Sequence, residues 1–255
     1  MKTLPPDKKI YFASDVHLGL YPEQKSRDRE KIFVRWMEEI RHDADELYLL
    51  GDIFDYWYEY RKVVPRGFTR TLGKLSELAD SGIKIHFFTG NHDVWVFDYL
   101  PQEIGLELHN EPYILEVNGC RMFLAHGDGL GPGDLGYKFL RRMFRSKFLQ
   151  WFYSRIHPNC SIRFAHWWSK KSRYSKGVAE AFQGEEKELL IVFAKKMLEK
   201  EQLDYFIFGH RHVPMDFRLN DRSRLINLGE WIFSNTYAVF DGSRLELKYY
   251  GKENT

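Results

Sequence analysis

The chain has 255 residues, of which 44% are hydrophobic, 29% charged and 16% aromatic, and its formal net charge at pH 7 is +2. This length fits one large domain or one domain with an insertion, and the composition excludes a disordered or fibrous chain. The first residues lack the apolar stretch of a signal peptide and no segment approaches the roughly 20 apolar residues of a membrane span, so we expect a cytoplasmic protein without a membrane-spanning helix.

The first half of the chain predicts an α/β fold. Three short apolar stretches, at residues 9–13, 46–50 and 83–89, are predicted as strands. Between them, residues 26–41 and 68–79 carry apolar side chains at the spacing of a helix with one buried face. This alternation of strands and helices is typical of the α/β class.

The second half predicts more strands. Residues 113–117 and 121–125 flank an Asn-Gly turn and are expected to form a β-hairpin. A helix at about 185–200 precedes a strand at 205–208. The tail, residues 215–250, alternates polar and apolar side chains between turn residues, and we expect it to supply the closing strands of a second sheet.

Residues 135–176, called here the basic aromatic segment, differ from the rest of the chain. They contain eleven Lys and Arg, eleven aromatic residues and no Asp or Glu, whereas the remainder carries a formal charge of about −9. Helical spacing within the segment predicts a basic amphipathic helix or helical pair. Such helices commonly lie on anionic membranes, although basic and aromatic residues together also bind single-stranded nucleic acid. A helical cap with solvated Lys and Arg is the simpler structural alternative.

Candidate metal ligands follow five of the predicted strands. They are Asp15 and His17, Asp52 and Asp55, Asn91 and His92, His126, and His210 with His212. Ligands of α/β proteins bind at the carboxyl ends of strands, and residues two apart on a strand share a face, so we expect these pairs to converge. Carboxylate, imidazole and amide ligands suit Mn, Fe or Zn, and the set is too large for one tetrahedral ion. The sequence therefore predicts two divalent ions that share one carboxylate.

The motifs resemble the full signature of the calcineurin-like metallophosphoesterases. The residues concerned are Asp15-x-His17, Gly51-Asp52-x-x-Asp55, Gly90-Asn91-His92-Asp93, His126 and Gly209-His210-x-His212. The resemblance implies an α/β fold built as a two-sheet β-sandwich flanked by helices. It also implies that one metal is held by Asp15, His17, Asp52 and His212, and the other by Asp52, Asn91, His126 and His210. Asp52 would bridge the two ions.

A catalytic role is expected for His92. Two-metal sites activate a water molecule and clamp phosphoryl oxygens, and His92 lies next to a ligand without being needed as one. We expect it to donate a hydrogen bond or a proton to the transition state or the leaving oxygen. Asp55 is expected to fix its tautomer. A plain structural hydrogen bond is the alternative for His92.

Within this superfamily the chain is most similar to the UDP-2,3-diacylglucosamine hydrolases, peripheral enzymes of lipid A synthesis on the inner membrane. The resemblance includes the run from Leu50 to Trp57 and residues that follow His126-Gly127-Asp128. It implies cleavage of the pyrophosphate of UDP-2,3-diacylglucosamine to UMP and lipid X, with Mn as the usual ion. It further implies a single domain, residues 1–255, in which residues 135–176 form an inserted helical lid. Residues that resemble substrate contacts are Asn91, Asp134, Tyr137, Arg141, Ser172 and Lys176.

Two positions depart from that family. Its well-known members carry Gly-Asn-Arg-Asp where this chain has His92, and Thr-Asp-Asp in place of Pro132-Gly133-Asp134. A nuclease or nucleotide phosphodiesterase of the same superfamily is therefore the alternative function, and a catalytically silent scaffold is a third, which the complete ligand set disfavours. We expect a lipid-linked nucleotide sugar as substrate in preference to nucleic acid, contact with an anionic membrane, and no obligate protein partner.

Overall fold

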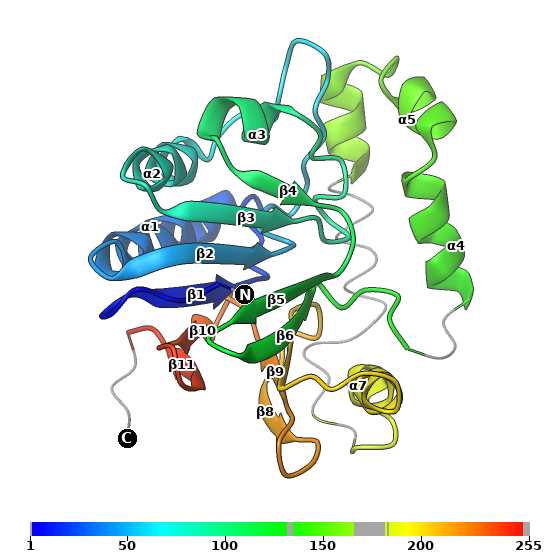
Figure 1. The fold of residues 1–255 in the computed structure, drawn as a ribbon. Helices are drawn as coiled ribbons and strands as arrows, with labels where there is room; N and C mark the ends of the chain where they lie inside the picture. The colour runs from blue at the N-terminus through cyan, green and yellow to red at the C-terminus, as the bar shows by residue number, and fades with distance from the viewer. Residues whose placement is uncertain (1, 132–134, 166–181, 183, 252–255) are drawn as a thin grey trace.

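Two β-sheets are stacked face to face, with helices on their outer faces (Figure 1). The computed structural model describes residues 2–131, 135–165, 182 and 184–251. Apolar side chains from both sheets, among them Phe12 and Tyr48 of the first and Leu124 and Ile207 of the second, form the cluster between them. This arrangement is the expected α/β sandwich flanked by helices.

The first sheet has six strands in the order β11-β10-β1-β2-β3-β4. Their bounds are β1 (Lys9–Ala13), β2 (Ala44–Leu50), β3 (Lys84–Phe88), β4 (Glu107–His109), β10 (Thr236–Phe240) and β11 (Leu245–Tyr249). Strands β1 to β4 are parallel, and β10 runs antiparallel to β1. The carboxyl ends of β1, β2 and β3 therefore lie at one edge of the sheet.

The second sheet has five strands in the order β5-β6-β7-β9-β8. Their bounds are β5 (Tyr113–Val117), β6 (Cys120–Ala125), β7 (Tyr205–Phe208), β8 (Pro214–Arg218) and β9 (Arg224–Leu228). The prediction that the whole tail closes this sheet was wrong, because β10 and β11 join the first sheet. Ala238 and Phe240 pack between the sheets from the first one, and an alternating pattern cannot distinguish which sheet receives a strand.

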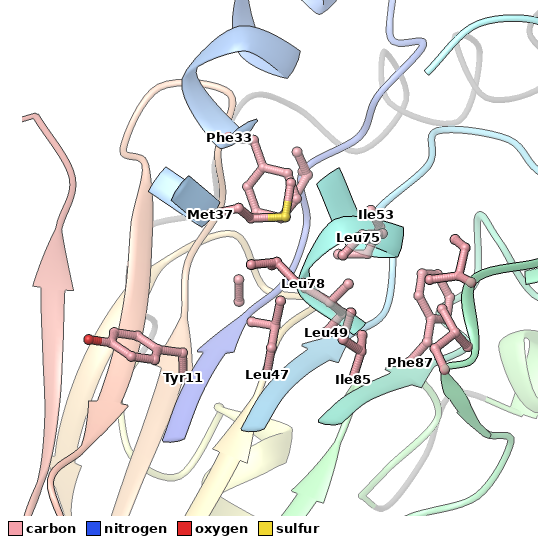
Figure 2. Close-up of a cluster of buried hydrophobic side chains, with 14 of the residues drawn as sticks. Tyr11, Phe33, Met37, Leu47, Leu49, Ile53, Leu75, Leu78, Ile85 and Phe87 are labelled. Carbon is pink, nitrogen blue, oxygen red and sulfur yellow. The ribbon is translucent and has the colours of Figure 1, made fainter. Parts of the chain in front are cut away.

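Helices α1 (Glu23–Ile40) and α2 (Thr69–Asp80) cover the outer face of the first sheet. Figure 2 shows Phe33 and Met37 of α1 and Leu75 and Leu78 of α2 packed against side chains of β2 and β3. Helix α7 (Leu189–Leu198) covers the second sheet. Helix α3 (Tyr99–Ile104), which was not predicted, begins where Glu59 accepts the N–H groups of residues 97–99.

The described part of the basic aromatic segment contains a helical pair, α4 (Leu135–Phe144) and α5 (Lys147–Tyr153), beside the strand ends (Figure 1). Aromatic side chains of the domain hold this pair. The Trp95 indole donates to the Phe144 carbonyl at 2.9 Å, and the Tyr58 hydroxyl donates to the Gln150 carbonyl at 2.8 Å. Among the described helices, none is long and apolar enough to cross a membrane.

Candidate metal centre

The carboxyl ends of five strands, three from the first sheet and two from the second, meet at one edge of the sandwich. β1, β2 and β3 of the first sheet and β6 and β7 of the second lead into the loops that carry the candidate ligands. The backbone N–H of Asp15 donates to the Gly51 carbonyl, and that of Gly209 donates to the His126 carbonyl. These contacts join neighbouring loops, as the sequence pattern predicted.

Most of the ligand residues have an uncommon backbone conformation. The φ angles of Asp15, His17, Asp52, His210 and His212 lie between +48° and +68°. Left-handed conformations are uncommon outside glycine, although Asp and His adopt them more readily than most residues, and they gather at functional sites. The expectation that strand alternation aligns these pairs was therefore wrong, because tight left-handed turns beyond the strand ends direct the side chains.

One group of ligands comprises Asp15, His17 and His212. The Nε2 atoms of the two histidines are 3.0 Å apart, and Asp15 Oδ1 lies 3.1 Å from His212 Nε2 and 3.7 Å from His17 Nε2. Two imidazole lone pairs at this distance repel each other unless a proton or a cation lies between them. Among the described residues, none donates a hydrogen bond to the buried Asp15 Oδ1. The convergence of these atoms fits a divalent cation.

A second group comprises Asp52, Asn91, His126 and His210. Asn91 Oδ1 lies 3.3 Å from His126 Nε2 and 3.0 Å from His210 Nδ1, and Asp52 Oδ2 lies 3.4 Å from His126 Nε2. His126 Nδ1 lies 2.8 Å from the Leu50 carbonyl oxygen, to which it donates. This bond fixes the tautomer and directs the Nε2 lone pair at the other ligands.

Asp52 joins the two groups. Its Oδ2 atom lies 3.8 Å from His17 Nε2 and 3.4 Å from His126 Nε2. Its Oδ1 atom accepts the backbone N–H of His92 at 2.8 Å, which fixes the orientation of the carboxylate. Asp15 is held in the same way, because its Oδ2 accepts the backbone N–H of His210 at 2.9 Å. The position of Asp52 supports a bridging role.

Glycines allow both carboxylates to approach the neighbouring backbone. A Cβ atom at Gly90 would collide with Asp52 Oδ1, and one at Gly209 would collide with Asp15 Oδ2. Gly90 lies two residues before His92, whose N–H donates to Asp52. Gly209 lies one residue before His210, whose N–H donates to Asp15. The need for glycine before Asn91 and before His210 in the motifs is therefore steric.

The structure changes the role expected of the Asp55 side chain. Asp55 Oδ1 lies 3.2 Å from His17 Nδ1 but 3.8 Å from His92 Nδ1. His92 Nδ1 instead lies 2.9 Å from the backbone carbonyl oxygen of Asp55. The Asp55 carboxylate thus orients the metal-ligand candidate His17, and the backbone of Asp55 orients His92. The sequence could not separate these roles, because both atoms belong to one residue.

Charge within the centre also favours cations. Burial opposes ionisation of Asp15, but the neighbouring imidazoles of His17 and His212 outweigh it and hold the pKa of Asp15 below its ordinary value. Burial also opposes ionisation of Asp52, but His126 and other histidines outweigh this effect and lower the pKa of Asp52. Burial lowers the pKa of His17, yet Asp15 and Asp55 raise it overall to about 9. Buried carboxylates that stay ionised among imidazoles in this way suit divalent metals.

Several supporting residues were given no role by the sequence. The buried Asp93 carboxylate accepts N–H groups from Gly90 and Ile53, both at 2.8 Å, and so ties the β3 loop to the β2 loop. Arg29 of α1 donates to the His17 carbonyl at 2.9 Å. Arg211 donates to the buried Glu188 carboxylate at the start of α7, at 3.0 and 3.1 Å. The motif Gly-Asn-His-Asp was the one signal that could have indicated Asp93.

The proposed substrate contacts are only partly described. Arg141 of α4 lies beside the loop that carries His126, where its Nη1 donates to the Asp128 carbonyl at 3.4 Å and its Nε lies 3.5 Å from Asp128 Oδ2. Tyr137 belongs to α4, and Asn91 lies within the second ligand group. The remaining predicted contacts, Asp134, Ser172 and Lys176, lie outside the described residues.

Comparisons with known proteins show which family the sequence matches. The sequence model of the family described as calcineurin-like phosphoesterase matches residues 8–214. The UDP-2,3-diacylglucosamine hydrolase of Porphyromonas gingivalis is 43% identical over 253 residues, which cover 94% of this chain and 97% of that protein. The enzyme of the same name from Actinobacillus succinogenes is 28% identical, with 94% and 98% covered. A dimetal phosphatase from Danio rerio has 14% identity and a TM-score of 0.42, with 97% of each chain covered.

Proposed function

The chain belongs to the calcineurin-like phosphoesterase family and is a metal-dependent hydrolase, and we propose that it cleaves the pyrophosphate of UDP-2,3-diacylglucosamine. The products would be UMP and lipid X, 2,3-diacylglucosamine 1-phosphate, an intermediate of lipid A biosynthesis. The proposed substrate rests on the extent of the match to hydrolases of that name, which covers nearly the whole length of both proteins. It includes far more than the motifs between Asp15 and His212.

The centre binds divalent metal, and we propose two ions with manganese as the native pair and Fe or Zn as alternatives. Asp15, His17, Asp52 and His212 would hold one ion, and Asp52, Asn91, His126 and His210 the other. The mixture of carboxylate, amide and imidazole ligands supports this choice of metals. Two such ions would supply an activated water and stabilise charge on the phosphoryl oxygens during an in-line displacement.

His92 is the proposed catalytic residue. Its Nδ1 donates to the Asp55 carbonyl oxygen 2.9 Å away, which fixes the orientation of the imidazole beside Asn91. The protonated ring would then carry a second proton on Nε2, which it can donate to a phosphoryl or leaving oxygen. Asp55 would act as a positioning residue, through its carboxylate on His17 and its carbonyl on His92.

We propose that residues 135–176 form a lid inserted in a single domain of residues 1–255. Exposed aromatic side chains of α5 support this proposal, since the exposed fractions of Phe148, Trp151 and Phe152 are 71%, 55% and 61%. A diacylated nucleotide sugar has an anionic head and apolar tails. Basic residues such as Arg141 would pair with phosphate, and aromatic residues would bury hydrocarbon at about 25 cal/mol per Å². Asn91, Asp134, Tyr137, Ser172 and Lys176 complete the proposed substrate contacts.

The same surface supports peripheral attachment to the cytoplasmic face of the inner membrane. Arg142 is exposed on α4, and Arg155 is exposed in the turn after α5, where it lies over Trp151. Each basic residue near an anionic surface contributes about 1 kcal/mol. Attachment of this kind needs no spanning helix and no protein partner.

A nuclease or nucleotide phosphodiesterase is the second candidate. The Arg155 guanidinium lies over the Trp151 ring, 4.9 Å from its centroid, and stacked pairs of this kind can hold unpaired bases. The dinuclear centre suits either phosphodiester or pyrophosphate cleavage. This candidate differs from the first in the substrate that the basic aromatic segment selects.

One assay with two substrates tests the proposed function. Manganese-loaded protein would be incubated with UDP-2,3-diacylglucosamine in mixed micelles, and separately with single-stranded DNA and RNA. We expect UMP and lipid X in equal amounts, no cleavage of nucleic acid, and no product with chelator present or with Asp52→Ala. Cleavage of nucleic acid without release of UMP would replace this proposal with the nuclease.

A further inference from the structure

A second cluster of metal-ligating side chains lies on the first sheet, away from the dinuclear centre. It comprises His86 of β3 with Glu107 and His109 of the edge strand β4, and is called here the edge-strand histidine site. His86 is opposite Glu107 in the parallel register, and His109 is opposite Phe88. Strand β3 ends at Phe88, Asn91 lies in the loop that follows, and the two sites share no ligand.

We propose that the edge-strand histidine site binds a divalent transition-metal ion of the zinc type. His86 Nδ1 lies 3.0 Å from His109 Nε2, Glu107 Oε2 lies 3.5 Å from His86 Nδ1, and Glu107 Oε1 lies 3.5 Å from His109 Nε2. Zinc bonds to imidazole nitrogen and carboxylate oxygen are about 2.0 to 2.2 Å long, so ligand atoms at tetrahedral angles are about 3.3 to 3.5 Å apart. The two nitrogens are slightly closer together than this, and with one Glu107 oxygen they lie near the spacing of three corners of a zinc site.

The surroundings of His86 match those of a metal-bound imidazole. Metal-ligating histidines usually direct their second ring nitrogen to a carboxylate. Among the described residues, none forms a hydrogen bond with the buried His86 Nε2, and the nearest carboxylate, Glu46 Oε2, lies 3.9 Å away. Glu46 is buried and is held in place by the Tyr48 hydroxyl, which donates to Oε2 at 2.8 Å. With a metal on Nδ1, the Nε2 proton would face this carboxylate.

Ring stacking fixes both imidazoles before any ion binds. Tyr48 stacks on His86 with a centroid distance of 4.2 Å and an interplanar angle of 4°, and Phe88 stacks on His109 at 4.5 Å and 17°. A preorganised pair of this kind loses little side-chain entropy on binding.

Glu107 gives the site its access to solvent. Its side chain is 65% exposed, whereas those of His86 and His109 are 8% and 10% exposed. An ion would therefore reach the two buried nitrogens past an exposed carboxylate, and water would complete the coordination. Because β4 has three residues and lies at the edge of the sheet, a bound ion would fasten this short strand to β3.

Zinc counting in the full-length chain tests this proposal. Wild-type protein would be stripped with chelator, dialysed against Zn²⁺, and compared by elemental analysis with Glu107→Gln and His109→Asn. We expect each variant to hold one zinc fewer per chain than the wild type, with the affinity for that ion lowered at least about tenfold. The matched control is Glu103→Gln, which changes an exposed carboxylate of α3 and should keep the full count.

Stability and activity separate this site from the dinuclear centre. The zinc-dependent rise in melting temperature should be smaller in Glu107→Gln than in the wild type, while manganese-dependent hydrolysis stays unchanged. Because Glu107 is exposed, this variant keeps the test valid even if His109→Asn folds poorly. Equal zinc counts and equal melting shifts in the wild type and Glu107→Gln would overturn the proposal.

Discussion

The backbone N–H of His92 donates a hydrogen bond to Asp52 Oδ1 over 2.8 Å. This bond fixes one oxygen of Asp52 and leaves Oδ2 between His17 Nε2 and His126 Nε2, at 3.8 and 3.4 Å. Residue 92 therefore contributes its main chain to the orientation of the proposed bridge and its side chain to the proposed chemistry. Substitution of the side chain should separate these two contributions.

Replacement of His92 by Ala should lower turnover by roughly 10²- to 10⁴-fold, the usual effect of losing a general acid or transition-state donor. Metal content should stay near normal, because the main-chain bond to Asp52 is retained. Steady-state kinetics and elemental analysis of the same preparation measure the two quantities. A variant that loses metal in proportion to activity would show that His92 is a ligand or a structural residue.

Replacement of Asp55 by Ala should act chiefly on metal binding. Its carboxylate bonds His17 Nδ1, and loss of such a partner usually weakens metal affinity by about 10- to 100-fold. Activity should therefore recover at high manganese concentration, in contrast with His92→Ala. Manganese titrations of activity for both variants provide the comparison. If excess manganese fails to restore Asp55→Ala while its metal content is full, the carboxylate acts on catalysis directly.

Replacement of Trp151 and Phe152 by Ser should impair hydrolysis of the lipid nucleotide far more than hydrolysis of a small chromogenic phosphodiester. Both side chains are more than half exposed, so the fold should not depend on them. Tyr249→Ser, which changes an exposed aromatic of the edge strand β11, is the matched control and should affect neither substrate selectively. Equal losses on both substrates would mean that the segment supports the fold and does not select the substrate.

Binding to membranes should depend on charge and salt. Combined replacement of Arg141, Arg142 and Arg145 by Gln should reduce sedimentation with anionic vesicles, and raising the salt concentration should release the wild type. Vesicles of neutral lipid serve as the control. Arg145 also pairs with Glu111 and donates to the Asn110 carbonyl at 2.7 Å, so circular dichroism should confirm the fold of the variant. Salt-independent binding would contradict an electrostatic attachment.

The strands and the candidate ligands could largely be predicted from the sequence, because each buried strand of the α/β half ends directly at a polar motif. Asp15, Asp52 and Asn91 follow β1, β2 and β3, and parallel strands bring such residues to one edge. Amphipathic spacing likewise indicated α1 and α2, since one face of each helix packs on the sheet.

Contacts between distant residues could not be predicted. Helix α3 begins at N–H groups that are accepted by Glu59, about 40 positions earlier in the chain. Asp93 organises two loops through backbone bonds that no spacing rule indicates. The left-handed turns at Asp15 and His210 depend on packing against the opposite motif, where Gly209 approaches the Asp15 carboxylate. Such features are set by tertiary contacts.

Electron paramagnetic resonance of the manganese-reconstituted protein tests the central claim, a dinuclear centre bridged by Asp52, most directly. Ions in two-metal sites lie roughly 3.5 to 4 Å apart, close enough for their electron spins to couple. We predict a coupled spectrum at two manganese ions per chain in the wild type and in Asp80→Ala, an exposed control on α2, and its loss in Asp52→Ala. A wild-type spectrum of isolated Mn²⁺ alone at saturating metal would contradict this account.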